Sequence, residues 1–328
     1  MMLAHTVIGG RSGALEPLNR DAMQTRWPNA QSPCRRRVFI CTAAFNVAVT
    51  GGSKGIGKAL AAEFIRAGDN VAICSRDSHR LESAVEELEA LAAATPGSST
   101  IKVCGLPANV TRSKDVAAFA DFVLKELGSV DIWINNAGTN GYAFKPLMEQ
   151  TEDEIVSVVE TNVVGVMLGC KEAIRVMKTQ PKGGHVFNMD GAGADGGATP
   201  RFAAYGATKR SLEQFSKSLR AELKFAGINN VGIHNLSPGM VTTELLMAGA
   251  DNKVSKFFIN CLAEQPETVA RSLVPRIRKV PGAQCTRILA ALGSGEYIRF
   301  LTKSKAYGNI LRRLTVGDRK NRFIDEDV

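Results

Sequence analysis

The sequence predicts an α/β protein in which a parallel sheet is covered by helices on both faces. From Phe45 onward, short β-rich runs alternate with longer helical patterns, which is the pattern typical of this class. A glycine-rich stretch from Thr50 to Gly57 stands between the first strand and the first helix, where such folds carry a phosphate-binding turn. Together these observations predict a single doubly wound Rossmann domain, followed by a helical C-terminal extension.

The expected elements follow one another without an internal repeat or a low-complexity linker, which favours one domain over two. Gly68 and Gly128 follow two predicted helix ends, where a left-handed residue commonly terminates a helix. Thr151 and Glu154 can form a capping box at the start of another helix. The predicted strands cover residues 45–49, 71–75, 101–105, 131–134, 185–188 and 231–236, and the predicted helices lie near residues 56–67, 78–93, 113–127, 152–178 and 203–225.

The two ends of the chain differ from this central pattern. Residues 1–38 are rich in arginine, poor in acids and without a central apolar region, which is typical of an organelle transit peptide; a disordered tail is the alternative. We therefore expect a core at residues 39–245 and an extension of the same domain, facing a substrate or a membrane, at residues 246–328.

Composition excludes several functional classes. The seven cysteines never occur in C-x-x-C spacing and the four histidines form no H-x-x-x-H pair, so we expect free thiols and no metal site. The longest apolar run, residues 38–49, is shorter than the roughly 20 residues that a membrane-spanning helix requires.

Positive charge is concentrated near the C-terminus. The net charge of the chain is +9, and residues 271–328 hold thirteen Lys or Arg against five acids, a balance of +8. This segment is either a solvated face or a surface that attracts an anionic membrane or an acidic partner. Because the sequence carries no nucleic-acid-binding motif, we expect no nucleic-acid partner.

The glycine-rich loop predicts a dinucleotide site. Backbone N–H groups at the start of a helix can bind a pyrophosphate, and glycines let it approach closely. The second strand ends in Ser75 and Arg76, where an NAD enzyme would offer an acid to the ribose, so a 2′-phosphate and therefore NADPH is preferred. The residues that we assign to the cofactor from this half of the chain are Gly51, Ser53, Lys54, Gly55, Ile56, Gly57, Ser75 and Arg76.

Tyr205 and Lys209 are four residues apart on a predicted helix and therefore share one face. An ammonium group below a phenol favours the phenolate, so this pair predicts a proton donor. We expect Lys209 to lower the pKa of Tyr205 from its usual value of about 10.

Three further segments complete a set of motifs. Asn136-Ala137-Gly138 follows the fourth strand, Asn162 lies within a long helix, and Pro238-Gly239 with Thr242 follows the sixth strand. With the glycine loop and Tyr205/Lys209, residues 45–245 resemble the short-chain dehydrogenase/reductase family. The resemblance implies that Tyr205 and Lys209 are catalytic and also contact the cofactor, and that Asn162 positions a water in a proton relay. It also implies further cofactor contacts at Asn109, Val110, Asn136, Ala137, Gly138, Pro238, Gly239, Val241 and Thr242.

The family's serine is missing before Tyr205, and its place falls at Gly191, or at Asp190 if the gap is placed otherwise. Loss of one donor to an oxyanion costs about 10²–10³ in rate. A backbone N–H of Gly191 or Ala192, an ordered water, or a protonated Asp190 can compensate. We interpret the small residues as room for a bulky, flat substrate; a plain glycine turn is the alternative.

Three stretches, two of them in the C-terminal extension, resemble a narrower family. Phe187 to Gly193 (FNMDGAG), Tyr297 to Thr302 (YIRFLT) and Phe257 to Pro266 (FFINCLAEQP) resemble chlorophyll(ide) b reductases of the form without membrane spans. That family implies NADPH-dependent reduction of the 7-formyl group of chlorophyll b or chlorophyllide b to hydroxymethyl, inside a plastid. The basic C-terminal segment would favour anionic thylakoid lipids or pigment–protein surfaces, so we expect the protein in the chloroplast stroma at the thylakoid surface. The resemblance further implies a homo-oligomer or a membrane-bound partner reductase. We expect an apolar substrate wall formed by Leu245, Leu246, Met247, Phe257, Phe258, Ile259 and Leu262.

Two other functions remain open from the sequence. A general short-chain reductase of a lipid or ketoacyl carbonyl would carry the same motifs. A non-catalytic NADPH-binding module would explain the missing serine, but it would have no need of Tyr205, Lys209 and Asn162.

Overall fold

The computed structural model describes residues 44–96, 100–142, 144–249, 252–283 and 295–326. These described residues belong to one compact unit. The transit or disordered segment expected at residues 1–38 lies outside the described residues.

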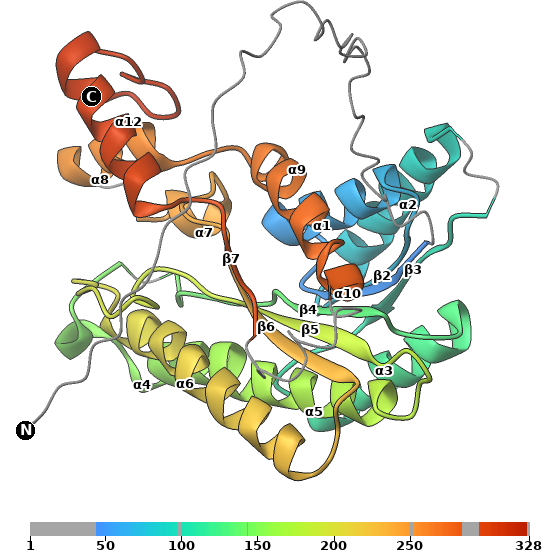
Figure 1. Ribbon diagram of the computed structural model, residues 1–328. Helices are drawn as coiled ribbons and strands as arrows, with labels where there is room; N and C mark the ends of the chain where they lie inside the picture. Colours follow the sequence, from blue (N-terminus) through green and yellow to red (C-terminus); the bar gives the residue numbers. More distant parts are fainter. Residues whose placement is uncertain (1–43, 97–99, 143, 250–251, 284–294, 327–328) are drawn as a thin grey trace, which may run out of the picture. The chain divides into compact units, whose positions relative to one another are not determined.

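One parallel sheet forms the centre of the described structure (Figure 1). Its strands are β1 (Asn46–Thr50), β2 (Asn70–Ser75), β3 (Val103–Pro107), β4 (Ile132–Asn135), β5 (Gly184–Met189), β6 (Val231–Ser237) and β7 (Tyr297–Arg299). They pair in the order β3-β2-β1-β4-β5-β6-β7. Since the chain runs outward from β1 to β3 and then returns to place β4 beside β1, the sheet has a switch point between β1 and β4.

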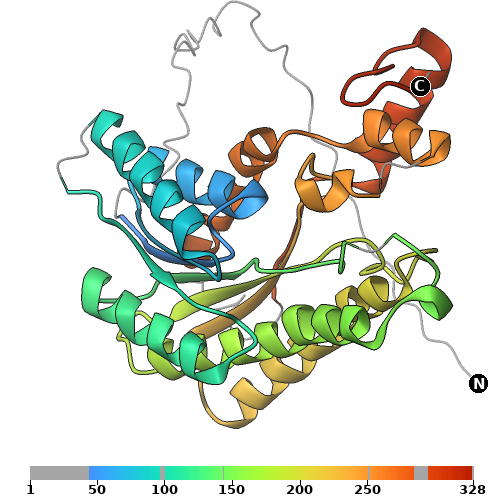
Figure 2. The same ribbon diagram turned by 180° about the vertical axis from the view of Figure 1, so that it is seen from behind.

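Helices cover both faces of the sheet (Figures 1 and 2). On one face lie α1 (Gly55–Arg66), α2 (Ser78–Ala94) and α9 (Pro266–Ile277); on the other lie α3 (Ser113–Leu127), α5 (Gly165–Met177) and α6 (Ala203–Phe225). The remaining helical segments are a 3₁₀ turn at Leu147–Glu149, α4 (Glu152–Val159), a π-helix at Glu160–Val164, α7 (Glu244–Met247), α8 (Lys253–Leu262), α10 (Val280–Ala283) and α12 (Lys303–Val316). The architecture is the predicted doubly wound Rossmann fold.

Two apolar layers hold the helices on the sheet. Alternate residues of a strand point to opposite faces, so Val47 and Val49 pack toward α1 and α9 whereas Ala48 packs toward α3 and α5. The central strands β1, β4 and β5 are buried along nearly their whole length, as expected for a parallel sheet, whereas the edge strand β3 is only partly buried.

The structure corrects three sequence expectations. The third strand begins two residues later than expected, at Val103. The helix expected at residues 152–178 contains the π-helix at Glu160–Val164, which separates α4 from α5. The C-terminal extension is not only helical, because β7 joins the sheet beside β6.

No helix in the described ranges is both long and apolar enough to cross a membrane.

Candidate active site

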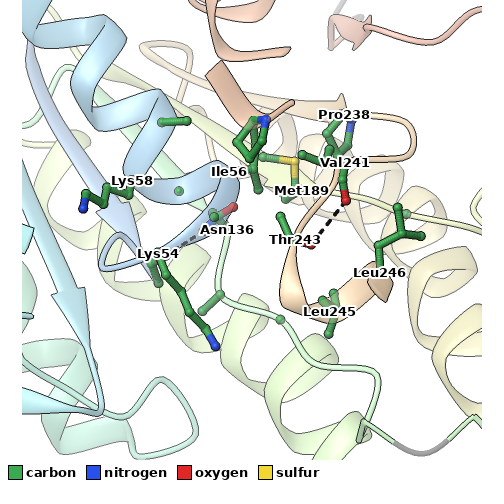
Figure 3. Close-up of a pocket in the computed structure, with 18 of the residues that line it drawn as sticks. Lys54, Ile56, Lys58, Asn136, Met189, Pro238, Val241, Thr243, Leu245 and Leu246 are labelled. Atoms are coloured by element: carbon green, nitrogen blue, oxygen red, sulfur yellow. Dashed lines mark hydrogen bonds between the residues drawn. The ribbon is translucent and has the colours of Figure 1, made fainter. Parts of the chain in front are cut away.

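A pocket of about 1200 Å³ opens at the carboxyl edge of the sheet. It is lined by the glycine loop after β1, by the ends of β2, β4, β5 and β6, by α6 and by the tail from β7 onward. Figure 3 shows the part of this lining that lies around the glycine loop, Asn136, Met189 and the segment from Pro238 to Leu246. This is the edge at which open α/β sheets bind their ligands. All of the residues that we assigned to the cofactor line this one pocket.

The glycine loop is fixed by close backbone contacts. Gly51 has φ +66°, and a Cβ there would lie 2.9 Å from Ala137 Cα. A Cβ at Gly57 would lie 2.3 Å from the carbonyl oxygen of Gly51. Asn136 Nδ2 donates to the carbonyl oxygens of Thr50 and Gly51 at 2.9 and 3.0 Å. Asn136 therefore holds the loop against the end of β4.

The end of β2 presents the residues expected to bind a ribose phosphate. Ser53 Oγ donates to Ser75 Oγ at 2.9 Å, which joins the glycine loop to β2. Arg76 is exposed at the pocket edge, and no ion pair is recorded for it among the described residues. Lys54, expected to bind the same phosphate, instead forms an ion pair with Glu244 at the start of α7.

Tyr205 and Lys209 lie together on α6, as the sequence predicts. Lys209 Nζ lies 5.6 Å from the Tyr205 ring centroid and donates to the Met189 carbonyl oxygen at 3.0 Å. This hydrogen bond joins α6 to the last residue of β5. A Cβ at Gly138 would lie 3.5 Å from Lys209 Nζ, so a longer side chain at this position would press against the ammonium group.

The pKa values of the pair differ from expectation. Burial raises the pKa of Tyr205, and the nearby charge of Asp190 raises it further. Burial also lowers the pKa of Lys209 to about 8, against the opposing effect of Asp190. The expected lowering of the phenol's pKa by Lys209 is therefore not found; Tyr205 is held in its protonated form.

Asn162 does not line the pocket. Its side chain is fully buried in the π-helix, where Oδ1 accepts from the Thr139 N–H at 2.9 Å. Its Nδ2 donates to the Thr139 carbonyl at 2.8 Å and to Thr208 Oγ1 at 3.1 Å. The amide thus connects the segment after β4 to α6, behind Tyr205. The structure gives Asn162 this bracing position, and its assignment to a water relay stays a prediction.

The space that the missing serine leaves is filled by Tyr205. A Cβ at Gly191 would lie 2.1 Å from Tyr205 Oη and 3.0 Å from Cζ. The interpretation of Gly191 as room for a bulky substrate is therefore wrong for this position, because the tyrosine hydroxyl occupies that room.

Asp190 lies under the tail strand. It is 5% exposed, and its Oδ2 accepts a hydrogen bond from the hydroxyl of Tyr297 in β7. Burial raises the pKa of Asp190 to about 6, although the Tyr297 hydrogen bond and the charges of Lys209 and Arg299 act to lower it. The sequence analysis named Asp190 as a site residue but did not identify Tyr297 as its hydrogen-bond partner.

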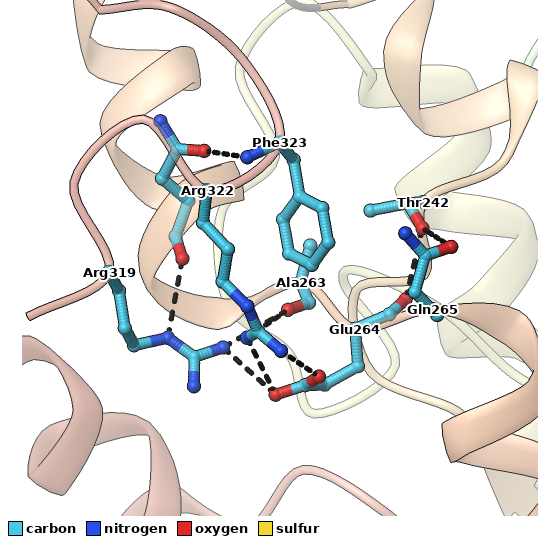
Figure 4. A network of polar contacts seen from close by, with 8 residues as sticks. Thr242, Ala263, Glu264, Gln265, Arg319, Arg322 and Phe323 are labelled. Carbon is cyan, nitrogen blue, oxygen red and sulfur yellow. Dashed lines mark hydrogen bonds and ion pairs between the residues drawn. The ribbon is translucent and has the colours of Figure 1, made fainter.

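The loop after β6, which contains the expected cofactor contacts Pro238 and Thr242, is braced by the C-terminal tail (Figure 4). Thr242 N donates to the Glu264 carbonyl oxygen at 3.0 Å. The Glu264 carboxylate in turn accepts from Arg319 and Arg322 at 2.9 and 2.7 Å. Burial acts to raise the pKa of Glu264, but the hydrogen bonds from Arg322 and Arg319 outweigh it and the pKa is lowered. The carboxylate therefore stays ionised.

Only part of the expected substrate wall reaches the pocket. Leu245 and Leu246 line it (Figure 3), whereas Met247 and the four residues expected from α8 do not. Instead, α8 packs against α12. Sequence reasoning named none of Tyr297, Arg299 and Leu301 as site residues, yet all three line the pocket. The signal for a strand there was the short alternation Tyr-Ile-Arg-Phe.

Within the described ranges, no group of three or more His, Cys, Asp or Glu side chains could hold a metal ion.

A protein-family match and two curated relatives of the chain agree with one another. The family described as short chain dehydrogenase matches residues 46–253. Chlorophyll(ide) b reductase NOL, chloroplastic, of Oryza sativa subsp. japonica is 51% identical over 86% of this chain and 79% of its own length. The protein of the same name from Arabidopsis thaliana is 51% identical over 87% of this chain and 78% of its own length.

Solved structures agree on the fold. An alcohol dehydrogenase from Thermococcus sibiricus, complexed with 5-hydroxy-NADP, superimposes with a TM-score of 0.62 at 22% identity. The match covers 77% of this chain and 94% of that one.

The contact between Gly191 and Tyr205 makes a prediction. Gly191→Ser or Gly191→Ala must displace the Tyr205 hydroxyl, because the added Cβ would overlap it. A misplacement of about 1 Å costs on the order of 10² in rate when the displaced group reacts. We expect turnover with a reduced nicotinamide cofactor to fall by about that factor. Gly308→Ala, which adds a Cβ in open space, should leave turnover unchanged. Wild-type turnover in Gly191→Ser would contradict the packing described here.

Proposed function

Because the chain belongs to the short chain dehydrogenase family, we propose that its pocket binds NADPH and reduces the 7-formyl group of chlorophyll b or chlorophyllide b to hydroxymethyl. The observation that carries the proposal is 51% identity to chlorophyll(ide) b reductases over 86% of the chain. The convergence of Tyr205, Lys209 and the glycine loop on one pocket supports it.

The residues of the pocket fit NADPH. The glycine loop leaves no room for side chains at Gly51 and Gly57, and it opens α1, whose N-terminus favours a phosphate. The β2 end offers Ser75 and the exposed Arg76, which suit a 2′-phosphate. When bound, NADPH supplies the hydride that the formyl carbon accepts.

The protein's own groups then handle the proton. Tyr205 donates its hydroxyl proton to the formyl oxygen as that oxygen gains charge. A raised pKa keeps the phenol protonated before the reaction, which is the form that donates. The Lys209 ammonium, held by the Met189 carbonyl, stabilises the phenolate left behind.

The pocket also has the size and the apolar lining for a flat pigment beside the cofactor. Its volume of about 1200 Å³ lies above the range of roughly 300–1,000 Å³ usual for small-molecule sites. Its large apolar side chains include Met189, Phe202, Met240, Leu245, Leu246 and Leu301.

Turnover tests this proposal. Purified protein with NADPH and chlorophyllide b should oxidise NADPH and shift the pigment's absorption to that of a hydroxymethyl product. Tyr205→Phe should lower the rate by about 10²–10⁴, since it removes the general acid, while still binding NADPH. NADH should be a poorer donor, because Arg76 would have no phosphate to bind.

Two outcomes would contradict the proposal. Reduction of small ketones with indifference to the pigment would favour a general reductase of a lipid or ketoacyl carbonyl. Tight NADPH binding without any turnover would favour a non-catalytic binding module, which the absence of a serine hydroxyl at Gly191 makes the second candidate.

We further propose a chloroplast location at an anionic lipid surface. The relatives are named chloroplastic, and α12 is an amphipathic helix without a buried residue. Its outer side exposes Tyr307, Leu311 and Leu314, each at least 62% exposed. The same helix carries the exposed cations Lys303, Lys305 and Arg312. A helix with apolar side chains and flanking cations suits the headgroup region of an anionic bilayer, where each cation contributes about 1 kcal/mol.

Vesicle flotation tests whether α12 binds an anionic membrane. The protein should float with vesicles that contain anionic thylakoid lipids and much less with neutral ones. Leu311→Glu combined with Leu314→Glu should reduce binding to the level of neutral vesicles, because it removes the apolar face. The control is Phe225→Glu at the end of α6, where an apolar side chain is 97% exposed. Equal loss in the control, or no loss in the double variant, would contradict the assignment.

We also propose that the chain pairs with a second copy through α4 and α5. Four apolar side chains along this run are 39–42% exposed in a single copy of the chain, and a second copy would cover them: Val156, Val159, Val164 and Met167. Sedimentation velocity should give a dimer or larger species, and Val156→Lys with Met167→Lys should give a monomer. Met148→Lys, at an 89% exposed position outside this face, should not change the mass. A monomeric wild type would contradict the proposal.

A further inference from the structure

The tail strand brings a second polar pair into the pocket. β7 pairs with β6 so that Tyr297 lies opposite Asn235 and Arg299 opposite Ser237. From this register the Tyr297 hydroxyl reaches the carboxylate of Asp190, which directly follows β5. Both residues line the pocket that also holds Tyr205 and Lys209.

Only half of the Asp190 carboxylate is satisfied. Oδ2 accepts from Tyr297, whereas Oδ1 is buried and has no hydrogen-bond partner among the described residues. A buried polar atom without a partner costs free energy, so such an atom at a pocket indicates that a ligand completes it. Because Oδ2 already accepts a hydrogen bond from the Tyr297 hydroxyl, a proton bound by Asp190 belongs on Oδ1.

Gly191 and Lys209 supply no second donor at this end, and the Ser237 hydroxyl faces the Asp190 carboxyl from β6. Gly191 carries no side chain, and the Tyr205 hydroxyl occupies the space beside it. The ammonium of Lys209 is directed at the Met189 carbonyl oxygen. A carbonyl oxygen that Tyr205 protonates would therefore receive no second hydrogen bond from a side chain at position 191, where the family pattern has a serine.

We propose that Asp190, protonated on Oδ1 and oriented by the Tyr297 hydroxyl, donates the second hydrogen bond to the formyl oxygen. This inference rests on the proposed reductase function and names the group that replaces the missing serine. Tyr297 is a positioning residue, because it acts on the substrate through Asp190. No proton is consumed at Asp190: hydride goes to carbon, the proton on oxygen comes from Tyr205, and Asp190 keeps its own.

The surroundings of Asp190 favour a carboxyl that can hold a proton. Burial raises its pKa to about 6. Tyr297 and Arg299 face it from β7, Ser237 from β6, and Lys209 from α6, and all four act to lower the pKa. A flat apolar substrate would exclude water from this end of the pocket and raise the pKa again. Ionisation of Asp190 at higher pH would place a negative charge beside the developing oxyanion and slow the reaction.

The pH dependence of hydride transfer tests the inference. Single-turnover NADPH oxidation with chlorophyllide b should slow, in the wild type, as pH rises through the pKa of Asp190. Asp190→Asn should lose this dependence and keep a rate within about tenfold of the wild type's acid-side rate, because the Asn amide donates without titrating. Tyr297→Phe should move the same transition to higher pH, since it removes a hydrogen bond that lowers the pKa of Asp190.

Controls separate this inference from a structural role and from the function itself. Asp121→Asn makes the same chemical change as Asp190→Asn at an exposed position on α3 and should leave the profile unchanged. If the wild type turns over and Asp190→Asn keeps the wild-type pH profile, the inference is overturned while the reductase function stands. If the wild type does not reduce the pigment at all, both are overturned.

Discussion

The return of the chain from β3 to a place beside β1 is the constraint on which the rest of the structure depends. It sets β1 beside β4, and the helices α1 and α5 that follow these two strands cover opposite faces of the sheet. The glycine loop leaves the sheet at this point, and Asn136 holds it there through two backbone carbonyls. The pocket follows from strand order before any catalytic side chain is considered.

The other side of the pocket depends on α6 and on the C-terminal tail. The bond from Lys209 to the Met189 carbonyl places Tyr205 at the end of β5. From the far edge, β7 pairs with β6, and the arginines that follow α12 bind Glu264 beneath the loop that contains Thr242. The tail is thus built into the site, since it supplies both a lining strand and a brace.

The sequence predicted those parts of the fold that depend on residues close together in the chain. The glycine loop, the strand–helix alternation and the Tyr205/Lys209 pair all follow from spacing within a few residues, and all lie where expected. Contacts between segments far apart in the chain could not be predicted from such spacing. The ion pair from Lys54 to Glu244 joins residues 190 apart in the chain, and β7 is only three residues long. The filling of the space at Gly191 by Tyr205 depends on how α6 packs on β5, which sequence spacing does not determine.

The central claim is that this pocket passes a hydride from NADPH to the formyl carbon of the pigment. The most direct measurement uses NADPH deuterated at both C4 positions, chlorophyllide b and the purified chain, with mass spectrometry of the pigment. Our account predicts a 7-hydroxymethyl product that carries deuterium on the hydroxymethyl carbon. A hydroxymethyl product without deuterium, or unchanged pigment in the presence of bound NADPH, would contradict it.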